Sequence, residues 1–241
     1  MKRLFYFLCI VSVFSLTSCI TIIEEIFLNK DGSGKFLLTV DLSAVMGMKE
    51  MLAGKLNSAN SDSLSLLQEK FDSIIYFNDM KDSVRRTLSY PHLVEKAHLQ
   101  LKGDEEAGIL KVTVHFPFKN VEEINQFQQD IQRYGKGGLN KEMTSDFLGY
   151  QTNFSKTKKS IERVTTYGEA KEVKEEDRLA ESMSKMMFAT ARVKSIYHLP
   201  GKIKSTTIPG ATVKGNQCEV ELSYPDFINR KKTMDGIITY K

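Results

Sequence analysis

The chain has 241 residues and a formal net charge of +4 at neutral pH, from 34 basic and 30 acidic side chains. Hydrophobic residues make up 41% of the sequence, which is enough to build a globular core. The near balance of charge, with both signs interspersed, argues against a protein that binds nucleic acid. The sequence contains neither an internal repeat nor a low-complexity segment.

The first residues carry the pattern of an export signal. Lys2 and Arg3 precede a stretch, Leu4 to Leu16, that is apolar apart from two serines. This stretch is shorter than the about 20 apolar residues that span a bilayer. A charged start, a short apolar region and small residues before a cleavage site together predict a secretory signal.

The signal ends in Leu16, Thr17, Ser18 and Cys19. These four residues resemble the lipobox of bacterial lipoproteins, in which a signal peptidase cuts just before a cysteine whose sulfur carries a diacylglycerol. The resemblance implies a signal peptide over residues 1–18 and a lipid attachment site at Cys19. Two or more acyl chains, such as palmitate, would hold the protein stably in its membrane. The alternative is an ordinary secretory signal in which the cysteine occurs by chance.

The other cysteines predict no internal disulfide. Cys9 would leave with the signal, and Cys19 would become a thioether, so only Cys218 remains. Alternation along its predicted strand puts Cys218 on the same face as Val220 and Leu222. A buried, inert thiol is therefore favoured over a reactive one.

The first predicted elements follow Cys19 directly. Two β-rich runs, at residues 20–29 and 35–42, flank the turn Asp31–Gly34 and predict a hairpin. Helices are predicted at residues 43–55 and 63–75, separated by a polar break. A second hairpin is predicted over residues 93–118, around a polar loop at 102–108.

The rest of the chain alternates between helix and strand. Asn120 is expected to cap an amphipathic helix that buries Val121, Ile124, Phe127 and Ile131. The patterns then predict one strand at 153–167, a helix at 172–191, two strands joined by a Pro-Gly turn at 192–210, a strand at 217–224 and a closing strand at 236–241. Hairpins with helices between them predict a single α+β domain over residues 19–241, an antiparallel sheet with helices packed on one face.

Several of these segments together resemble the LppM-like lipoprotein domain family. The resemblance lies in the cysteine followed at once by a strand, the hairpin at 30–43, the segment 116–127 and the late segment 197–223 with its Pro-Gly turn. It implies an α+β envelope lipoprotein that binds a lipid or glycolipid, with no settled activity.

The sequence offers little chemistry. His92, His98, His115 and His198 match no zinc-ligand spacing, although His98 and His115 are expected to face each other across the second hairpin. Adjacent carboxylates such as Glu24 and Glu25 point to opposite faces of a strand, so they do not converge as an acid–base pair. No nucleophile motif is present. We therefore expect that the protein is not an enzyme and that it binds neither a metal nor a cofactor.

A methionine-rich stripe is the one unexplained feature of the sequence. It joins Met46 on the first helix to Met183, Met186 and Met187 on the helix at 172–191. The simpler interpretation is core packing against the sheet. The functional interpretation is an adaptable apolar groove that accepts an acyl chain, because methionine fills irregular space around varied ligands.

The expected function is that of a non-enzymatic bacterial envelope lipoprotein, anchored in a membrane through Cys19, that binds a lipid or glycolipid. The alternative is a module that contacts another envelope protein. An outer-membrane anchor with the domain facing the periplasm is favoured if the cell has two membranes. The short basic clusters Lys156–Ser160 and Asn229–Lys232 are either solvated loops or contacts to anionic headgroups.

Overall fold

The fold is known from a computed structural model, which describes residues 20–46, 70–79, 82–137, 149–168, 182 and 188–241. The predicted signal peptide, Cys19 and Met183, Met186 and Met187 lie outside these residues. Most of the two helices expected at 43–55 and 172–191 also lies outside them. Those expectations therefore stay predictions.

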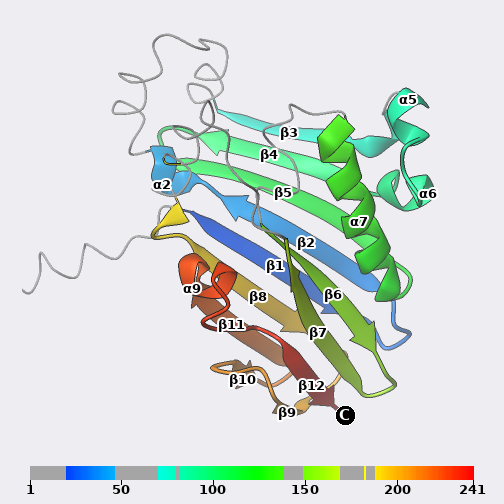
Figure 1. Ribbon diagram of the computed structural model, residues 1–241, viewed down its shortest axis with the longest axis vertical. Helices are drawn as coiled ribbons and strands as arrows, with labels where there is room; N and C mark the ends of the chain where they lie inside the picture. Colours follow the sequence, from blue (N-terminus) through cyan, green and yellow to red (C-terminus); the bar gives the residue numbers. More distant parts are fainter. Residues whose placement is uncertain (1–19, 47–69, 80–81, 138–148, 169–181, 183–187) are drawn as a thin grey trace, which may run out of the picture.

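Eight strands form a large sheet in the order β10-β11-β8-β1-β2-β5-β4-β3 (Figure 1). The strands are β1 Thr21–Leu28, β2 Gly34–Asp41, β3 Phe71–Tyr76, β4 His98–Asp104, β5 Ile109–Phe118, β8 Arg192–His198, β10 Thr212–Lys214 and β11 Gln217–Ser223. All neighbours are antiparallel except β1 and β8, which run parallel. The first strand after the N-terminal segment therefore lies inside the sheet, with a partner on each side.

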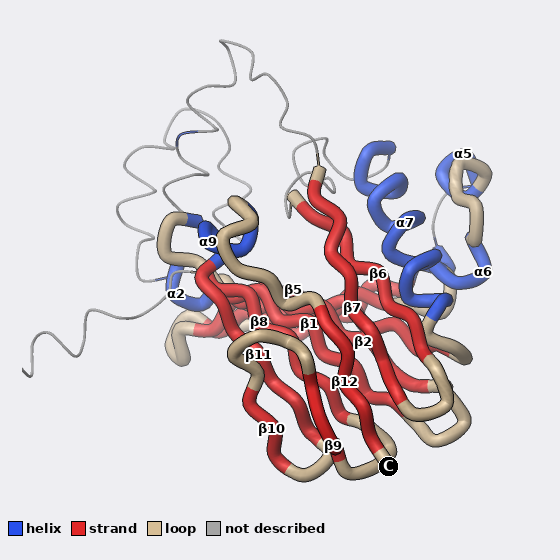
Figure 2. Tube along the Cα trace, turned by 60° about the horizontal axis from the view of Figure 1, so that its bottom comes forward, coloured by secondary structure: helices blue, strands red, loops and turns tan. Residues whose placement is uncertain are grey.

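Four strands form a small antiparallel sheet in the order β6-β7-β12-β9. They are β6 Tyr150–Lys156, β7 Ser160–Tyr167, β9 Ile203–Thr206 and β12 Gly236–Tyr240. Figure 1 shows β6 and β7 crossing in front of the large sheet, and Figure 2 shows the two sheets from a second angle. The aromatic rings of Phe154 on β6 and Phe36 on β2 meet with centroids 6.4 Å apart, so this sheet packs on the large one.

Most helices in the described ranges are short. They are α2 Ser43–Met46, the 3-10 turn η2 Phe77–Asp79, α5 Asp82–Arg85, α6 Pro91–Val94, α7 Glu122–Gly137 and α9 Tyr224–Ile228. Helix α7 packs beside the small sheet on the same face, where the Phe127 ring stacks on Phe116 of β5 at 4.2 Å. We call this covered side of the large sheet its inner face.

Alternation along the strands builds the core on the inner face. Ile22, Ile26 and Leu28 of β1 are buried there, and so are Phe36 of β2 and Phe116 of β5. The buried apolar side chains form one cluster that includes residues of both sheets and of α7. Full burial of each large apolar side chain contributes about 1.5–3 kcal/mol, so this cluster supplies the main stabilisation.

The predicted hairpins are confirmed. In the first, Gly32 takes the left-handed φ of 93°, and the Asp31 carboxylate accepts hydrogen bonds from the backbone and hydroxyl of Ser33. The second joins β4 to β5 in register, but its first strand begins at His98 and not at residue 93, because residues 91–94 form helix α6. The cap of α7 is also confirmed, because the Asn120 side chain accepts a hydrogen bond from the Glu123 backbone at 3.1 Å. Cys218 is buried, as its strand pattern predicted.

Two predicted elements are wrong. The helix expected at 63–75 is contradicted over its last part, which belongs to strand β3 paired with β4. A short apolar run does not by itself distinguish helix from strand. Residues 71–76 form a strand here because they pair with the edge of β4. The single strand expected at 153–167 is instead the hairpin of β6 and β7. Its turn lacks glycine and is closed by a hydroxyl pair, Thr157 with Ser160 at 2.6 Å.

The expected fold class is confirmed only in its coarser form. The protein mixes helices and sheets, but it has two sheets, and strands dominate. We expected one antiparallel sheet with helices on one face. Instead, the small sheet shares the inner face with α7, and the β1–β8 pair is parallel. The small sheet collects strands from distant parts of the chain, which no local pattern reveals.

Gly34 should not tolerate a side chain. A Cβ there would lie 2.0 Å from the Phe27 carbonyl oxygen and 2.5 Å from the Phe118 ring. We expect Gly34→Ala to lower the free energy of unfolding by about 2 kcal/mol, measured by urea denaturation followed by circular dichroism. Gly168→Ala is the matched control, because its Cβ would meet only the Gly149 oxygen at 3.7 Å. Equal stability of the two variants would contradict this packing.

Candidate functional site

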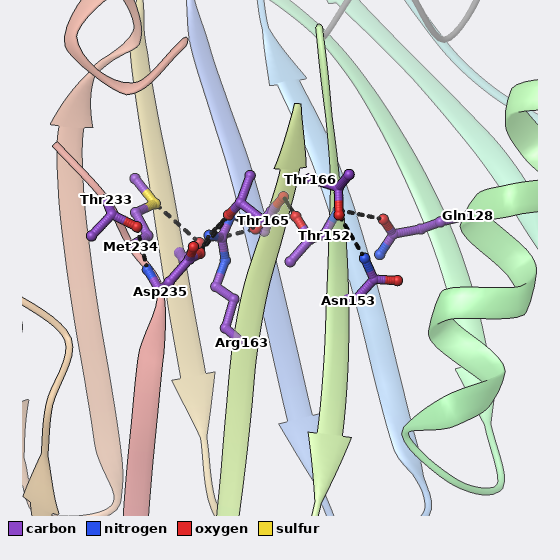
Figure 3. A network of polar contacts seen from close by, with 11 residues as sticks. Gln128, Thr152, Asn153, Arg163, Thr165, Thr166, Thr233, Met234 and Asp235 are labelled. Atoms are coloured by element: carbon purple, nitrogen blue, oxygen red, sulfur yellow. Dashed lines mark hydrogen bonds and ion pairs between the residues drawn. The ribbon is translucent and has the colours of Figure 1, made fainter. Parts of the chain in front are cut away.

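A buried polar cluster joins the two sheets. Its centre is an ion pair between Glu24 of β1 and Arg163 of β7, with Nη2 and Oε2 3.0 Å apart. Glu24 is 4% exposed and Arg163 is 1% exposed. The other members are Thr152, Thr165, Ser195 and Asp235. We call these six residues the buried polar cluster (Figure 3).

Glu24 faces inward because of its place in β1. It lies between Ile22 and Ile26 in the alternation, so its side chain enters the core with theirs. The carboxylate accepts three hydrogen bonds, from Arg163, from the Thr152 hydroxyl at 2.9 Å and from the Ser195 hydroxyl at 3.0 Å. These donors come from β6, β7 and β8, so a single carboxylate links both sheets. A buried charge needs such partners, because an unpaired one is very costly.

The Arg163 guanidinium completes the link on the other side. Its Nη1 donates to the Thr165 hydroxyl at 2.5 Å and to the Asp235 carboxylate at 3.1 Å. Figure 3 shows Thr165 and Asp235 converging on Arg163. The Phe227 ring lies 5.6 Å below the guanidinium. Burial is the largest single influence and by itself lowers the pKa of Arg163, but the Glu24 carboxylate together with Tyr197 and Tyr150 outweighs it, so the pKa is raised.

Two tyrosines lie close to this ion pair. Burial, followed by the charge of Glu24, raises the pKa of Tyr150 well above its ordinary value. Burial likewise raises the pKa of Tyr197. Both phenols therefore stay neutral at physiological pH. The cluster holds the Arg163 guanidinium between two carboxylates, the buried Glu24 and the partly exposed Asp235, with neutral hydroxyls around them. This arrangement holds strands of the two sheets together.

The opposite face of the large sheet carries a different set of side chains. The rings of His98 and His115 stack at 4.5 Å, which confirms the expected pairing across β4 and β5. Farther along the sheet, His198 contacts the Glu25 carboxylate at 2.7 Å and stacks on Phe27. In the part of the chain that the structure describes, no three His, Cys, Asp or Glu side chains are placed to hold a metal ion.

The end of the large sheet at which β1 begins is where the predicted anchor joins the fold. Ile20 is 1% exposed, and its carbonyl accepts a hydrogen bond from Arg192 at 2.9 Å. Thr21 pairs with Asp41 on one side and Arg192 on the other. The residue directly after Cys19 is therefore already part of the core. No helix among the described residues has the length and apolarity to cross a membrane.

Helix α9 lies at this same end. The Tyr224 backbone donates to the Ala191 carbonyl at 2.8 Å, which ties the helix to the start of β8. The basic cluster Asn229–Lys232 follows α9 directly. Its Arg230 side chain covers the Tyr167 ring at 5.0 Å. We call this region, made of Ile20, α9 and residues 229–232, the strand-start end (Figure 1).

The structure brings together only some of the predicted site residues. Met46 lies half-buried in α2 beside β5, while its three predicted partners are outside the described residues. The apolar groove is therefore untested. Cys218 is wholly buried, and burial raises the pKa of its thiol, as expected for an inert cysteine.

Sequence reasoning missed the buried polar cluster. In the sequence, Glu24 is recognisable only as half of an adjacent carboxylate pair, and no motif or spacing distinguishes Arg163 from the other basic residues. One signal was available, because Glu24 interrupts the otherwise apolar face Ile22, Ile26 and Leu28. A charge on a buried face requires an opposite charge nearby, but the sequence does not say which of the basic residues supplies it.

Comparisons with known proteins give little further guidance. No protein-family model matches the chain, and no curated protein does. Among solved structures, the NMR structure of the folded domain of LppM from Mycobacterium tuberculosis aligns with 92% of this chain and 91% of its own length. The sequence identity is 10% and the TM-score is 0.46. Similarity at this level transfers no function, so the proposals below rest on the residues of this chain.

The buried ion pair should behave as a unit. We expect Arg163→Met to lower the free energy of unfolding by about 3–5 kcal/mol, because Glu24 is then buried without its counter-charge. Adding Glu24→Gln should restore a large part of that loss. The measurement is urea denaturation of both variants and of Arg192→Met, a control at the exposed Arg192–Glu221 pair that should cost less than about 1 kcal/mol. Similar losses for Arg163→Met and Arg192→Met would contradict the assignment.

The stacked histidines predict a pH dependence. Burial, together with the charges of His98 and Lys35, lowers the pKa of His115 below its ordinary 6.5. The unfolded chain therefore binds a proton more readily at this site, so stability is full above pH 6.5 and falls as the pH drops below it. We expect His115→Gln to flatten the fall in unfolding free energy between neutral and mildly acidic pH. The exposed His92→Gln controls for loss of a histidine, and an equal effect of both would contradict the prediction.

Proposed function

We propose that this protein is a lipid-anchored component of the bacterial cell envelope, held in its membrane by a diacylglyceryl group on Cys19. The chemistry required is present in the sequence: a short apolar signal, the lipobox residues Leu16, Thr17 and Ser18, and the cysteine itself. In a cell with two membranes, we place it on the outer membrane, facing the periplasm.

One observation carries the proposal. Ile20, the residue after Cys19, is already buried, and β1 begins at Thr21 in the interior of the large sheet. A chain that still carried its apolar signal would have to place it directly beside the core. Cleavage before Cys19 leaves a folded domain in which the buried Ile20 directly follows the lipid-bearing cysteine. Two acyl chains on that cysteine supply enough buried methylenes for stable anchoring.

We further propose that the domain acts by binding, without catalysis, and that its ligand is a lipid or glycolipid. The buried polar cluster supports the first part, since its carboxylate is saturated with hydrogen bonds from the protein. Met46, half-buried in α2 near the strand-start end, supports the second, together with the sequence positions of Met183, Met186 and Met187.

A second candidate function rests on strand β3. This strand forms one edge of the large sheet and leaves Ile74, Ile75 and Tyr76 about half exposed, at 50%, 49% and 53%. An exposed apolar edge strand is a template for pairing with another chain. The rival proposal is therefore a module that adds a strand from another envelope protein.

Intact-mass and lipid analysis of the full chain, purified from bacterial membranes, tests both the lipid anchor on Cys19 and the proposed lipid ligand. The anchor predicts a chain that begins at Cys19 and carries a diacylglyceryl mass, whereas Cys19→Ala should leave the signal uncut and add no lipid. Native mass spectrometry should then detect a bound lipid beyond the covalent one. Met183→Glu with Met187→Glu should remove the bound lipid, and Val213→Glu at an exposed site on β10 should retain it.

The outcomes separate the proposals. A mature chain without added mass on Cys19 would refute the anchor. A lipidated, folded chain without bound lipid would refute the lipid ligand and favour the edge-strand module. In that case cross-linking from Ile75→Cys in β3 should capture a neighbouring envelope protein. The reagent should react at position 75 and not at Cys218, because Cys218 is buried.

A further inference from the structure

The two basic clusters of the sequence lie at opposite ends of the molecule. Residues 229–232 follow α9 at the strand-start end, next to the point where Cys19 joins the sheet. Residues 156–160 form the turn between β6 and β7. That turn lies beside the turn of the first hairpin, since a Cβ added to Gly32 would lie 3.7 Å from the Lys156 Nζ.

The sheet register gives the distances. Ser223, the last residue of β11, pairs with Arg192, and Arg192 pairs with Thr21. Two strand spacings, about 10 Å, therefore separate the start of β1 from the start of α9. The turn of the first hairpin lies beyond the full eight residues of β1, about 25 Å away. The Debye length at physiological ionic strength is about 8 Å, so of the two basic clusters only residues 229–232 lie close enough to feel the charge of a membrane at Cys19.

The charges of this loop are available to a partner. Arg230 and Lys231 are exposed, and neither joins an ion pair within the described part of the chain. Lys232 pairs with Asp226 at 3.0 Å. Arg230 is held over the Tyr167 ring in a left-handed conformation, with φ of 59°. Arg192 and Lys111, also at this end of the sheet, are already paired with carboxylates.

We propose that Arg230 and Lys231 bind anionic lipid headgroups and thereby seat the strand-start end of the domain flat on its own membrane. This inference rests on the proposed anchor at Cys19. The anchor sets where the domain is held, and the loop sets its orientation. Because β1 begins without a tether, the domain has little freedom to carry the loop away from the surface. A surface of anionic headgroups attracts each nearby lysine or arginine. For one such residue, this attraction raises the membrane-binding constant about fivefold.

The test places the lipidated full chain in vesicles and measures how fast its own lysines are acylated. Vesicles of phosphatidylcholine alone are compared with vesicles containing about 30% phosphatidylglycerol. A water-soluble acylating reagent is added, and modification is measured by peptide mass spectrometry. We expect acylation of Lys231 to slow by about threefold or more in the anionic vesicles and to recover in high salt. Lys158 and Lys159, on the same molecules, should react equally in both.

Two charge-reversal variants distinguish a contact made by residues 229–232 from a general effect of the protein's charge. Arg230→Glu should abolish the protection of Lys231, while Lys158→Glu, an equal charge reversal at the far turn, should leave it intact. Arg230→Asn removes the charge with a residue that tolerates the left-handed conformation, so it should weaken protection without strain. This variant covers the case in which the reversal disturbs the fold.

The outcomes distinguish this inference from the proposed anchor. Vesicle flotation and intact mass report the anchor alone. A chain that floats with both kinds of vesicle but shows equal acylation of Lys231 in each would overturn the headgroup contact and leave the anchor standing. Protection of Lys231 in native envelopes but not in anionic vesicles would also overturn it, in favour of an acidic protein partner. Failure to float would refute the anchor itself.

Discussion

The pairing of Glu24 with Arg163 is the constraint on which the arrangement of the two sheets depends. The two residues are 139 positions apart in the chain, and each is buried in a separate sheet. Neither could be buried alone, because an isolated charge in a protein interior is far less stable than in water. The ion pair can form only when β7 lies over β1, so it selects one orientation of the small sheet. Apolar packing around it provides the stability, and the pair provides the register.

This constraint also determines what surrounds the start of β1, where the proposed anchor would lie. Because β7 is fixed over β1, its last residues reach the strand-start end, where Tyr167 contacts Phe227 of α9 at 5.6 Å. Helix α9 is held from the other side by the start of β8. The basic loop is thus supported by both sheets. A domain built this way presents one defined end to whatever lies at residue 19.

The elements that the sequence predicted well are those set by near neighbours. The turn at Asp31–Gly34 needs only its own glycine and aspartate, and the cap of α7 needs only Asn120 and the residues just after it. The stacking of His98 and His115 followed from the register of one hairpin. The misses have the opposite character. Strand β3 depends on the free edge of β4, and the small sheet depends on strands that are far apart in the chain.

The sequence by itself determined the buried Cys218 and most hairpins, and it predicted an export signal and a candidate anchor, because each is a property of a short segment. Only the tertiary structure decided that β8 runs parallel beside β1, and that Arg163 rather than another basic residue meets Glu24. It also decided that the two basic clusters lie at opposite ends. The physical reason is that burial and distance depend on contacts between remote segments. A local pattern shows that Glu24 needs a partner, and the fold supplies Arg163.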